Sequence, residues 1–269
     1  MAAGATPIAV TIAGSDSGGG AGIQADLKTF SALGVYGASV IAALTAQNTL
    51  GVTGIHDVPA DFITAQIDAV FSDLAVGAVK IGMLSRPATI AAVADGLARW
   101  NQRDVVLDPV MVAASGDRLL SEDAVATLRD KLLPRASLVT PNLPEAAVLL
   151  DTAVAGDEAA MLAQARALLT FGPAAVLIKG GHASGEESVD LLVDASGVLR
   201  LPAPRIATRN THGTGCTLSS AIAAGLARGA PLREAVQAAK DYISRAIAAS
   251  DTLTIGKGHG PVHHFHAWW

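Results

Sequence analysis

Short apolar segments alternate with longer helical patterns along most of this chain, and this alternation restricts the possible folds more than any other feature. The expected strands cover residues 8–13, 37–45, 78–83, 105–109, 138–140 and 175–179. The expected helices cover residues 23–33, 60–71, 88–100, 122–133, 145–150 and 158–171. Apolar residues run continuously along the strands, which is typical of a parallel sheet covered on both faces. The pattern predicts an α/β fold with a doubly wound, mostly parallel central sheet flanked by helices on both faces.

The alternation of strands and helices ends before the last part of the chain. Residues 189–193 and 198–202, joined by a short Asp-Ala-Ser-Gly connection, predict an antiparallel hairpin. Helices are expected after it at residues 217–226 and 232–249. Hydrophobic residues make up 51% of the 269 residues and charged residues 16%, which is enough to fill a large core. Since no internal repeat or linker is recognisable, the sequence predicts a single domain over residues 1–269.

Composition also excludes several classes of protein. The formal net charge is −5 and there is no basic run, so nucleic acid is not an expected partner. The single cysteine rules out an internal disulfide and fits a reducing cytoplasm, and the first seven residues make a poor signal peptide. Residues 29–55 carry no charge, but glycines and amides interrupt them, so no membrane span is expected.

Residues 210–216 (NTHGTGC) form a glycine-bearing turn that leads directly into a helix of small residues. The first N–H groups of a helix lack partners and favour negative charge, and Gly213 and Gly215 allow the backbone to approach an anion closely. Cys216 stands at the start of the helix, where a thiolate is favoured. Together with Thr214, these residues predict an anion-binding turn with a candidate base, as phosphoryl transfer requires.

A second glycine loop, at residues 14–22 (GSDSGGGAG), follows the first expected strand. It is not a Walker loop, and although it matches G-x-G-x-x-A, no acidic residue follows between Asp26 and Asp57 to bind a ribose. A mobile loop that closes over a small substrate is the favoured interpretation. Asp26 either complements the dipole of the following helix or accepts a hydrogen bond from a substrate.

Several chemically useful side chains stand at strand ends, where open α/β sheets bind ligands. The amide of Gln47 either forms a turn with Asn48 or offers a donor and an acceptor to a heterocycle. Met83 and Val110 either pack in the core or wall an apolar pocket.

Four further polar residues stand at the ends of strands that come later in the chain. Each has a structural interpretation and an alternative one as part of a site for phosphate and metal. Asn142 is expected to cap a helix whose first turn holds Glu145. Alternatively, Asp108 and Glu145 hold a magnesium ion through water. Lys179, which precedes two glycines, either meets a phosphate or is an exposed structural lysine.

The last eleven residues contain four histidines and two tryptophans. The histidines lack helical i, i+4 spacing and a nearby carboxylate or cysteine, so zinc is not expected. The segment is interpreted as a docking tail.

Taken in order, these segments resemble the hydroxymethylpyrimidine/phosphomethylpyrimidine kinases of bacterial thiamine biosynthesis, which belong to the ribokinase-like superfamily. The resemblance runs nearly end to end. Its strongest parts are residues 14–30 (GSDSGGGAGIQADLKTF), 45–49 (TAQNT), 80–84 (KIGML), 106–111 (VLDPVM), 140–146 (TPNLPEA), 179–182 (KGGH), 210–216 (NTHGTGC) and 258–269 (GHGPVHHFHAWW).

The resemblance implies that the γ-phosphoryl group of ATP is transferred to 4-amino-5-hydroxymethyl-2-methylpyrimidine and then to its monophosphate, with ATP and Mg²⁺ as cofactors. It also implies a cytoplasmic enzyme that is commonly a dimer. The residues that it assigns to the pyrimidine are Gly14, Ala21, Asp26, Gln47, Met83 and Val110. It assigns the anion hole to residues 213–216 with Cys216 as base, and many sugar kinases of the superfamily have aspartate at that position. Lys179, Asn142 and Gly215 are expected near the nucleotide, and Asp108 and Glu145 near the metal.

Three other functions remain open on the sequence. A pyridoxal kinase of vitamin B6 salvage resembles this chain in fold and in the turn at residues 213–216. A non-catalytic pyrimidine sensor would not need Asp108, Glu145, Lys179 and Cys216. A Rossmann-type oxidoreductase is disfavoured because the acidic residue that binds a ribose is missing.

Overall fold

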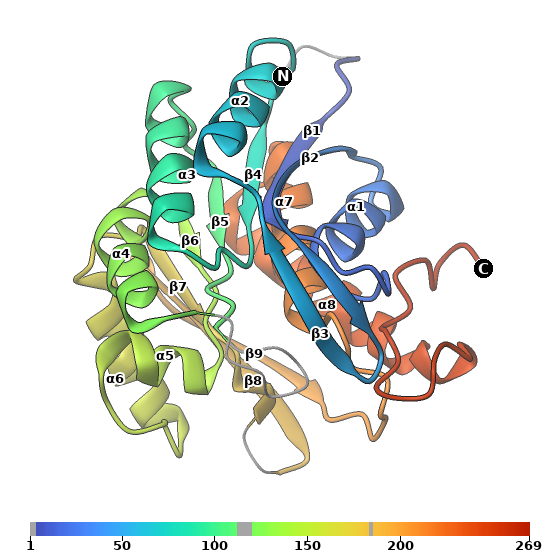
Figure 1. Ribbon diagram of the computed structural model, residues 1–269. Coiled ribbons are helices and arrows are strands. Elements are labelled where there is room, and N and C mark those ends of the chain that lie inside the picture. Colours follow the sequence, from blue (N-terminus) through green and yellow to red (C-terminus); the bar gives the residue numbers. More distant parts are fainter. Residues whose placement is uncertain (1–3, 112–119, 183–184) are drawn as a thin grey trace.

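A computed structural model describes residues 4–111, 120–182 and 185–269, and its centre is a nine-stranded sheet (Figure 1). The strand order is β3-β2-β1-β4-β5-β6-β7-β8-β9. The strands are β1 (Ile8–Gly14), β2 (Tyr36–Asn48), β3 (Gly51–Asp57), β4 (Ala78–Ile81), β5 (Val105–Leu107), β6 (Leu138–Val139), β7 (Ala175–Ile178), β8 (Glu187–Asp194) and β9 (Gly197–Pro204). In this spatial order the strands from β2 to β7 run parallel, with antiparallel β3 at one side and the antiparallel β8–β9 hairpin at the other.

Helices cover both faces of this sheet (Figure 1). One face packs against α2 (Ala60–Phe71), α3 (Pro87–Arg99), α4 (Glu122–Lys131), α5 (Leu143–Leu150) and α6 (Glu158–Leu169). The other packs against α1 (Gly22–Ala32), α7 (Thr214–Ala227) and α8 (Leu232–Ala248). Ala9 and Val10 are neighbours on β1, both are fully buried, and they lie in different cores. This double burial explains the continuous apolar runs, and the predicted doubly wound, mostly parallel sheet with helices on both faces is confirmed.

The β2–β3 hairpin differs from the sequence-based prediction. Strand β2 continues to Asn48 instead of ending at residue 45, and it pairs antiparallel with β3, which was not predicted. Strand β3 lies at the sheet edge with every residue at least partly exposed, so it lacks the apolar run that marks the central strands. The extension carries Gln47 out to the cavity described below.

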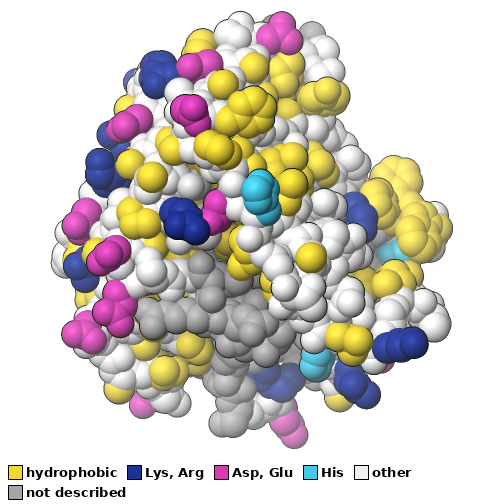
Figure 2. Space-filling view, in the orientation of Figure 1, with side chains coloured by type: hydrophobic (Ala, Val, Ile, Leu, Met, Phe, Trp, Pro, Cys, Tyr) yellow, Lys and Arg dark blue, Asp and Glu magenta, His cyan; other side chains and the backbone are white. Residues whose placement is uncertain are grey.

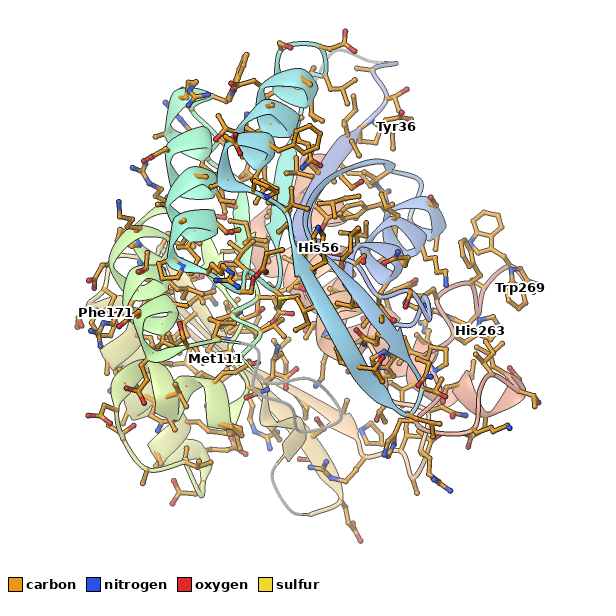
Figure 3. The ribbon with its side chains drawn as sticks, viewed as in Figure 1. Tyr36, His56, Met111, Phe171, His263 and Trp269 are labelled. Carbon is orange, nitrogen blue, oxygen red and sulfur yellow. The ribbon has the colours of Figure 1, made fainter. Side chains whose placement is uncertain are left out.

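The C-terminal segment packs against its own chain, whereas the sequence suggested a docking tail. The backbone N–H of His212 donates to Gly260 O at 3.0 Å, and Nε2 of the buried His264 lies 3.1 Å from Thr217 Oγ1. The rings of His263 and Trp269 are 4.7 Å apart, and both residues are labelled in Figure 3. Figure 2 shows hydrophobic side chains protruding on the side of the molecule where the C-terminus lies. In the described part of the chain, no helix has both the length and the apolarity needed to cross a membrane.

Candidate active site

A cavity of about 710 Å³ opens beyond the carboxyl ends of the parallel strands, and almost all of the predicted site residues line it. Its walls come from the loops after β1, β4, β5, β6 and β7 and from the beginning of α7. The predicted residues that line it are Gly14, Ala21, Gln47, Met83, Asp108, Val110, Asn142, Glu145, Lys179, Gly213, Thr214, Gly215 and Cys216. The structure therefore brings together residues that are far apart in the sequence.

Asp16 organises the glycine loop after β1. Its carboxylate accepts backbone hydrogen bonds from Gly18 at 2.8 Å, Gly20 at 3.0 Å and Ala21 at 2.8 Å. Nε2 of His212 lies 2.9 Å from the same carboxylate. Burial alone raises the pKa of Asp16, but His212 and the backbone donors hold it below its usual range. Sequence reasoning missed Asp16 and His212, although an aspartate two residues before a run of three glycines is a recognisable turn former.

The glycine loop also touches the anion-binding turn directly. Gly213 has φ of 80°, and a Cβ atom there would lie only 2.0 Å from Gly20 O. A Cβ atom on Gly20 would in turn lie 2.5 Å from the His212 ring. In this structure the loop lies against the turn, and a mobile loop that closes over a substrate stays a prediction.

One end of the cavity is apolar and carries a single amide. Gly14 donates its N–H to Met83 O at 3.2 Å, and a Cβ atom on Gly14 would lie 2.4 Å from the Met83 methyl group. The Gln47 side chain accepts a hydrogen bond from Thr45 Oγ1 at 3.2 Å, and its Nε2 lies 3.4 Å from Nε2 of His212. With Val110, these groups form a recess suited to a flat heterocycle with polar edges.

Asp26 does not occupy the predicted position in this recess. It is fully buried and is not among the residues that line the cavity. Its carboxylate accepts hydrogen bonds from Thr11 at 2.6 Å, Lys80 at 2.8 Å and Ser220 at 2.7 Å. Protein donors thus reach both carboxylate oxygens of Asp26, and a direct contact between Asp26 and a substrate stays a prediction.

Asp108, Glu145 and Lys179 form a charged cluster at the other end of the cavity. Lys179 Nζ lies 2.7 Å from Asp108 Oδ1 and 3.9 Å from Glu145 Oε2. Burial raises the pKa of Glu145 to about 7, while Lys179 lowers it and the charge of Asp108 raises it further. A capping box positions the glutamate: Asn142 Oδ1 accepts from the Glu145 N–H at 2.9 Å, and Glu145 accepts from the Asn142 N–H at 2.8 Å. The expected helix cap at Asn142 is thus confirmed.

This cluster suits Mg²⁺ better than a metal that needs a full set of protein ligands. Within the described ranges, no group of three or more His, Cys, Asp or Glu side chains is arranged to hold a metal ion. Two carboxylates nevertheless lie beside a single lysine in a buried place, and burial together with the charge of Asp108 raises the pKa of Glu145. Mg²⁺ takes few protein carboxylates and keeps several waters, so this donor set fits it.

Cys216 is the third residue of α7, which begins at Thr214, and it is half-buried at the cavity wall. The sequence predicted that the helix N-terminus favours the thiolate. Burial instead raises the pKa of the Cys216 thiol to about 11; Lys80 and the Gly22 N–H lower it, and Asp26 and Asp108 raise it. The thiol is therefore protonated near neutral pH, so burial outweighs the expected effect of the helix N-terminus.

The turn at residues 213–216, a lysine and two carboxylates line one cavity together with an apolar recess, all at the edge of one doubly wound sheet. This combination of fold and side chains is what a phosphotransferase that acts on a small molecule requires.

Comparison with known proteins specifies the family. The model of the phosphomethylpyrimidine kinase family matches residues 16–263, and the chain belongs to this family. A hydroxymethylpyrimidine/phosphomethylpyrimidine kinase of Rhizobium meliloti is 67% identical over 98% of this chain and 99% of its own length. A solved pyridoxal kinase of Bacillus subtilis, in complex with ADP, superposes with a TM-score of 0.91 at 36% identity, covering 98% of this chain and 99% of that one. The phosphomethylpyrimidine kinase of Clostridium difficile superposes with a TM-score of 0.79 at 45% identity, covering 89% and 99%.

Proposed function

We propose that this chain phosphorylates 4-amino-5-hydroxymethyl-2-methylpyrimidine with MgATP and then phosphorylates the monophosphate to the diphosphate, in thiamine biosynthesis. Membership of the phosphomethylpyrimidine kinase family supports this reaction. The structural observation that carries it is the position of Cys216 and the anion-binding turn between the apolar recess and the Lys179 cluster. A hydroxymethyl group in the recess thereby faces a phosphoryl group bound at the turn.

In the first transfer the substrate hydroxyl attacks the γ-phosphorus, and ADP leaves as the bond to its β-phosphate oxygen breaks. The Cys216 thiol first gives its proton to water, and the resulting thiolate then accepts the hydroxyl proton as general base. The N–H groups at the beginning of α7 and the Lys179 ammonium balance the charge that develops on the transferred group. In the second transfer a phosphate oxygen attacks, so the base matters less.

The nucleotide is assigned to the part of the cavity beyond Lys179. Leu218, Ile243 and Ile247 from α7 and α8 line the cavity together with Pro204 and Ile206 at the end of β9. These apolar side chains make a slot for a nucleobase, with the triphosphate directed towards Lys179, Asn142 and Gly215. Asp108 and Glu145 would hold Mg²⁺, which would neutralise phosphate charge when bound.

A pyridoxal kinase is the alternative that a specific observation favours, because the Bacillus subtilis enzyme superposes along nearly the whole chain. Its substrate is also a flat heterocycle with a hydroxymethyl group, which the same recess would admit. The higher identity to the Rhizobium meliloti enzyme favours the pyrimidine as the main substrate. A single domain over residues 1–269, a cytoplasmic location and a homodimer complete the proposal.

The test is a mass-resolved time course with the hydroxymethylpyrimidine, ATP and Mg²⁺, and with pyridoxine in a parallel reaction. Monophosphate that appears first and is then converted to diphosphate would support the proposal. Pyridoxine phosphate as the only product would move the assignment to vitamin B6 salvage. Pyrimidine binding without any phosphorylated product would indicate a sensor and refute the kinase assignment.

A further inference from the structure

Lys80 is a buried cation to which the proposed mechanism gives no role. It lies on β4 among apolar neighbours, its side chain is fully buried, and it is nevertheless among the residues that line the cavity. Its Nζ lies 2.8 Å from both carboxylate oxygens of Asp26 on α1. A charge in such a place is costly unless it is paired, so its presence calls for an explanation.

Hydrogen bonds from several secondary-structure elements hold the Lys80–Asp26 ion pair in place. Thr11 on β1 donates to Asp26 Oδ2 at 2.6 Å, and Ser220 on α7 donates to Asp26 Oδ1 at 2.7 Å. Ser220 follows Cys216 by four residues, so the two side chains lie on the same side of α7. A Cβ atom on Gly82 would lie 2.8 Å from Lys80 Nζ, so the glycine at this position leaves room for the ammonium. The pair is thus attached to the helix that carries Cys216.

The charges that face Cys216 come from four parts of the sheet and its helices. They are Lys80 on β4, Asp26 on α1, Asp108 after β5 and Lys179 after β7. Among the influences on the pKa of Cys216, burial raises it most and Lys80 is the largest that lowers it. Lys179 is engaged with Asp108 at 2.7 Å, at the phosphate end of the cavity.

We infer that Lys80, held by Asp26, is a positioning residue whose fixed positive charge stabilises the thiolate form of Cys216 during the first phosphoryl transfer. This inference rests on the proposed role of Cys216 as proton acceptor. The thiol gives its proton to water, takes up the hydroxyl proton as the new O–P bond forms, and carries a negative charge only between these events. Lys80 faces that charge without touching the substrate.

The single cysteine of the chain makes the inference directly measurable. Alkylation by iodoacetamide, an uncharged reagent, reports the thiolate fraction of Cys216 in the ligand-free protein when its rate is followed between about pH 7 and 9.5. Lys80→Met leaves Asp26 buried without a partner and so endangers folding. The principal variant is therefore Lys80→Met combined with Asp26→Asn, which removes both charges together.

A matched control is a second buried lysine–aspartate pair that borders the cavity. Lys240 on α8 and Asp190 on β8 are 2.7 Å apart, and both are nearly fully buried. Replacing them by Met and Asn changes charge and packing in the same way, but not beside Cys216. Alkylation in this control should keep the wild-type rate.

In the Lys80/Asp26 variant the thiol pKa should rise by about one pH unit, because the opposing charge is lost and its effect exceeds that of Asp26. Alkylation at a fixed pH then slows by about three- to fourfold, since a more basic thiolate is also more reactive. The first transfer should slow relative to the second. Unchanged alkylation, or equal slowing in both pair variants, overturns the inference.

Cys216→Ala separates this inference from the proposed function. If it loses the first transfer while alkylation slows only in the Lys80/Asp26 variant, both proposals are supported. If it retains both transfers at the wild-type rate, the base role fails, and the inference that rests on it fails with it. If it loses the first transfer but alkylation is unchanged in the Lys80/Asp26 variant, only the inference about Lys80 is overturned.

Discussion

Replacing Gly213 by alanine tests whether contact between the two glycine loops sets the geometry of the anion-binding turn. The added Cβ atom meets two separate obstacles. The backbone has φ of 80°, a conformation that costs an L-residue about 1–2 kcal/mol. The Cβ atom would also lie 2.0 Å from Gly20 O, a backbone atom that cannot rotate away, so one of the two loops must move.

Gly34 provides the reference for backbone strain alone. It lies between α1 and β2 with φ of 73°, and a Cβ atom there would have no neighbour within 4 Å. Gly34→Ala should therefore lower the free energy of unfolding by about 1–2 kcal/mol, or Tm by roughly 2–8 °C, with unchanged kinetics. Gly213→Ala carries the same strain together with the displacement of the turn.

The decisive assay compares kcat of the first transfer in the two variants, with Tm measured by differential scanning fluorimetry. Loss of one donor to a developing oxyanion typically lowers kcat by about 10²–10³-fold, and Gly213→Ala should approach that loss. Gly34→Ala should retain the wild-type kcat. If kcat of Gly213→Ala stays close to that of Gly34→Ala, contact between the loops does not set the turn geometry, and the reasoning is refuted.

Further predictions concern the base, the helix cap and the buried glutamate. Cys216→Ala should slow the first transfer more than the second, since the second acceptor is already an anion; equal losses in separate assays with alcohol and monophosphate would reject this division. Asn142→Ala should lower stability by about 1 kcal/mol and weaken Mg²⁺ binding, because it frees the backbone that positions Glu145; thermal melts with a Mg²⁺ titration measure both effects. The pKa of Glu145 is raised from 4.5 to about 7, so in the ligand-free protein its contribution favours folding below pH 4.5 and is lost as the pH rises to 7. The loss amounts to about 3 kcal/mol, and Glu145→Gln should remove that part of the pH dependence in denaturant titrations at about pH 4.5 and 7; identical pH dependence in both proteins would contradict the assignment.

The central strands could be predicted because burial on both faces requires a continuous run of apolar residues, which is visible in the sequence. Strand β1 shows the reason: Ala9 and Val10 enter opposite cores, so both must be apolar. Strand β3 has no continuous apolar run, because it lies at an edge and its residues are at least partly exposed. Its presence depends on pairing with β2, which local sequence does not encode.

The candidate site likewise contains residues that could be placed from the sequence and features that could not. Residues at strand ends, such as Lys179, could be placed because a parallel sheet brings its carboxyl ends to one edge. The buried hydrogen bonds of Asp26 could not be predicted, because its partners, Lys80 and Ser220, are distant in the sequence and their convergence appears only in the fold. The protonation of Cys216 was misjudged for a related reason, since the helix N-terminus was visible in the sequence and the degree of burial was not.

A protonated thiol is well suited to a site that must accept two different substrates. With a pKa of about 11, raised chiefly by burial, the Cys216 side chain is uncharged near neutral pH and does not repel ATP or a pyrimidine monophosphate. A carboxylate at the same place would keep its charge and oppose the second acceptor, which is itself an anion. The weakness of a neutral thiol as a base then matters only in the first transfer, when a hydroxyl proton must be removed. A fixed ammonium such as that of Lys80 compensates for this weakness when the thiolate forms, without placing negative charge in the cavity during the second transfer.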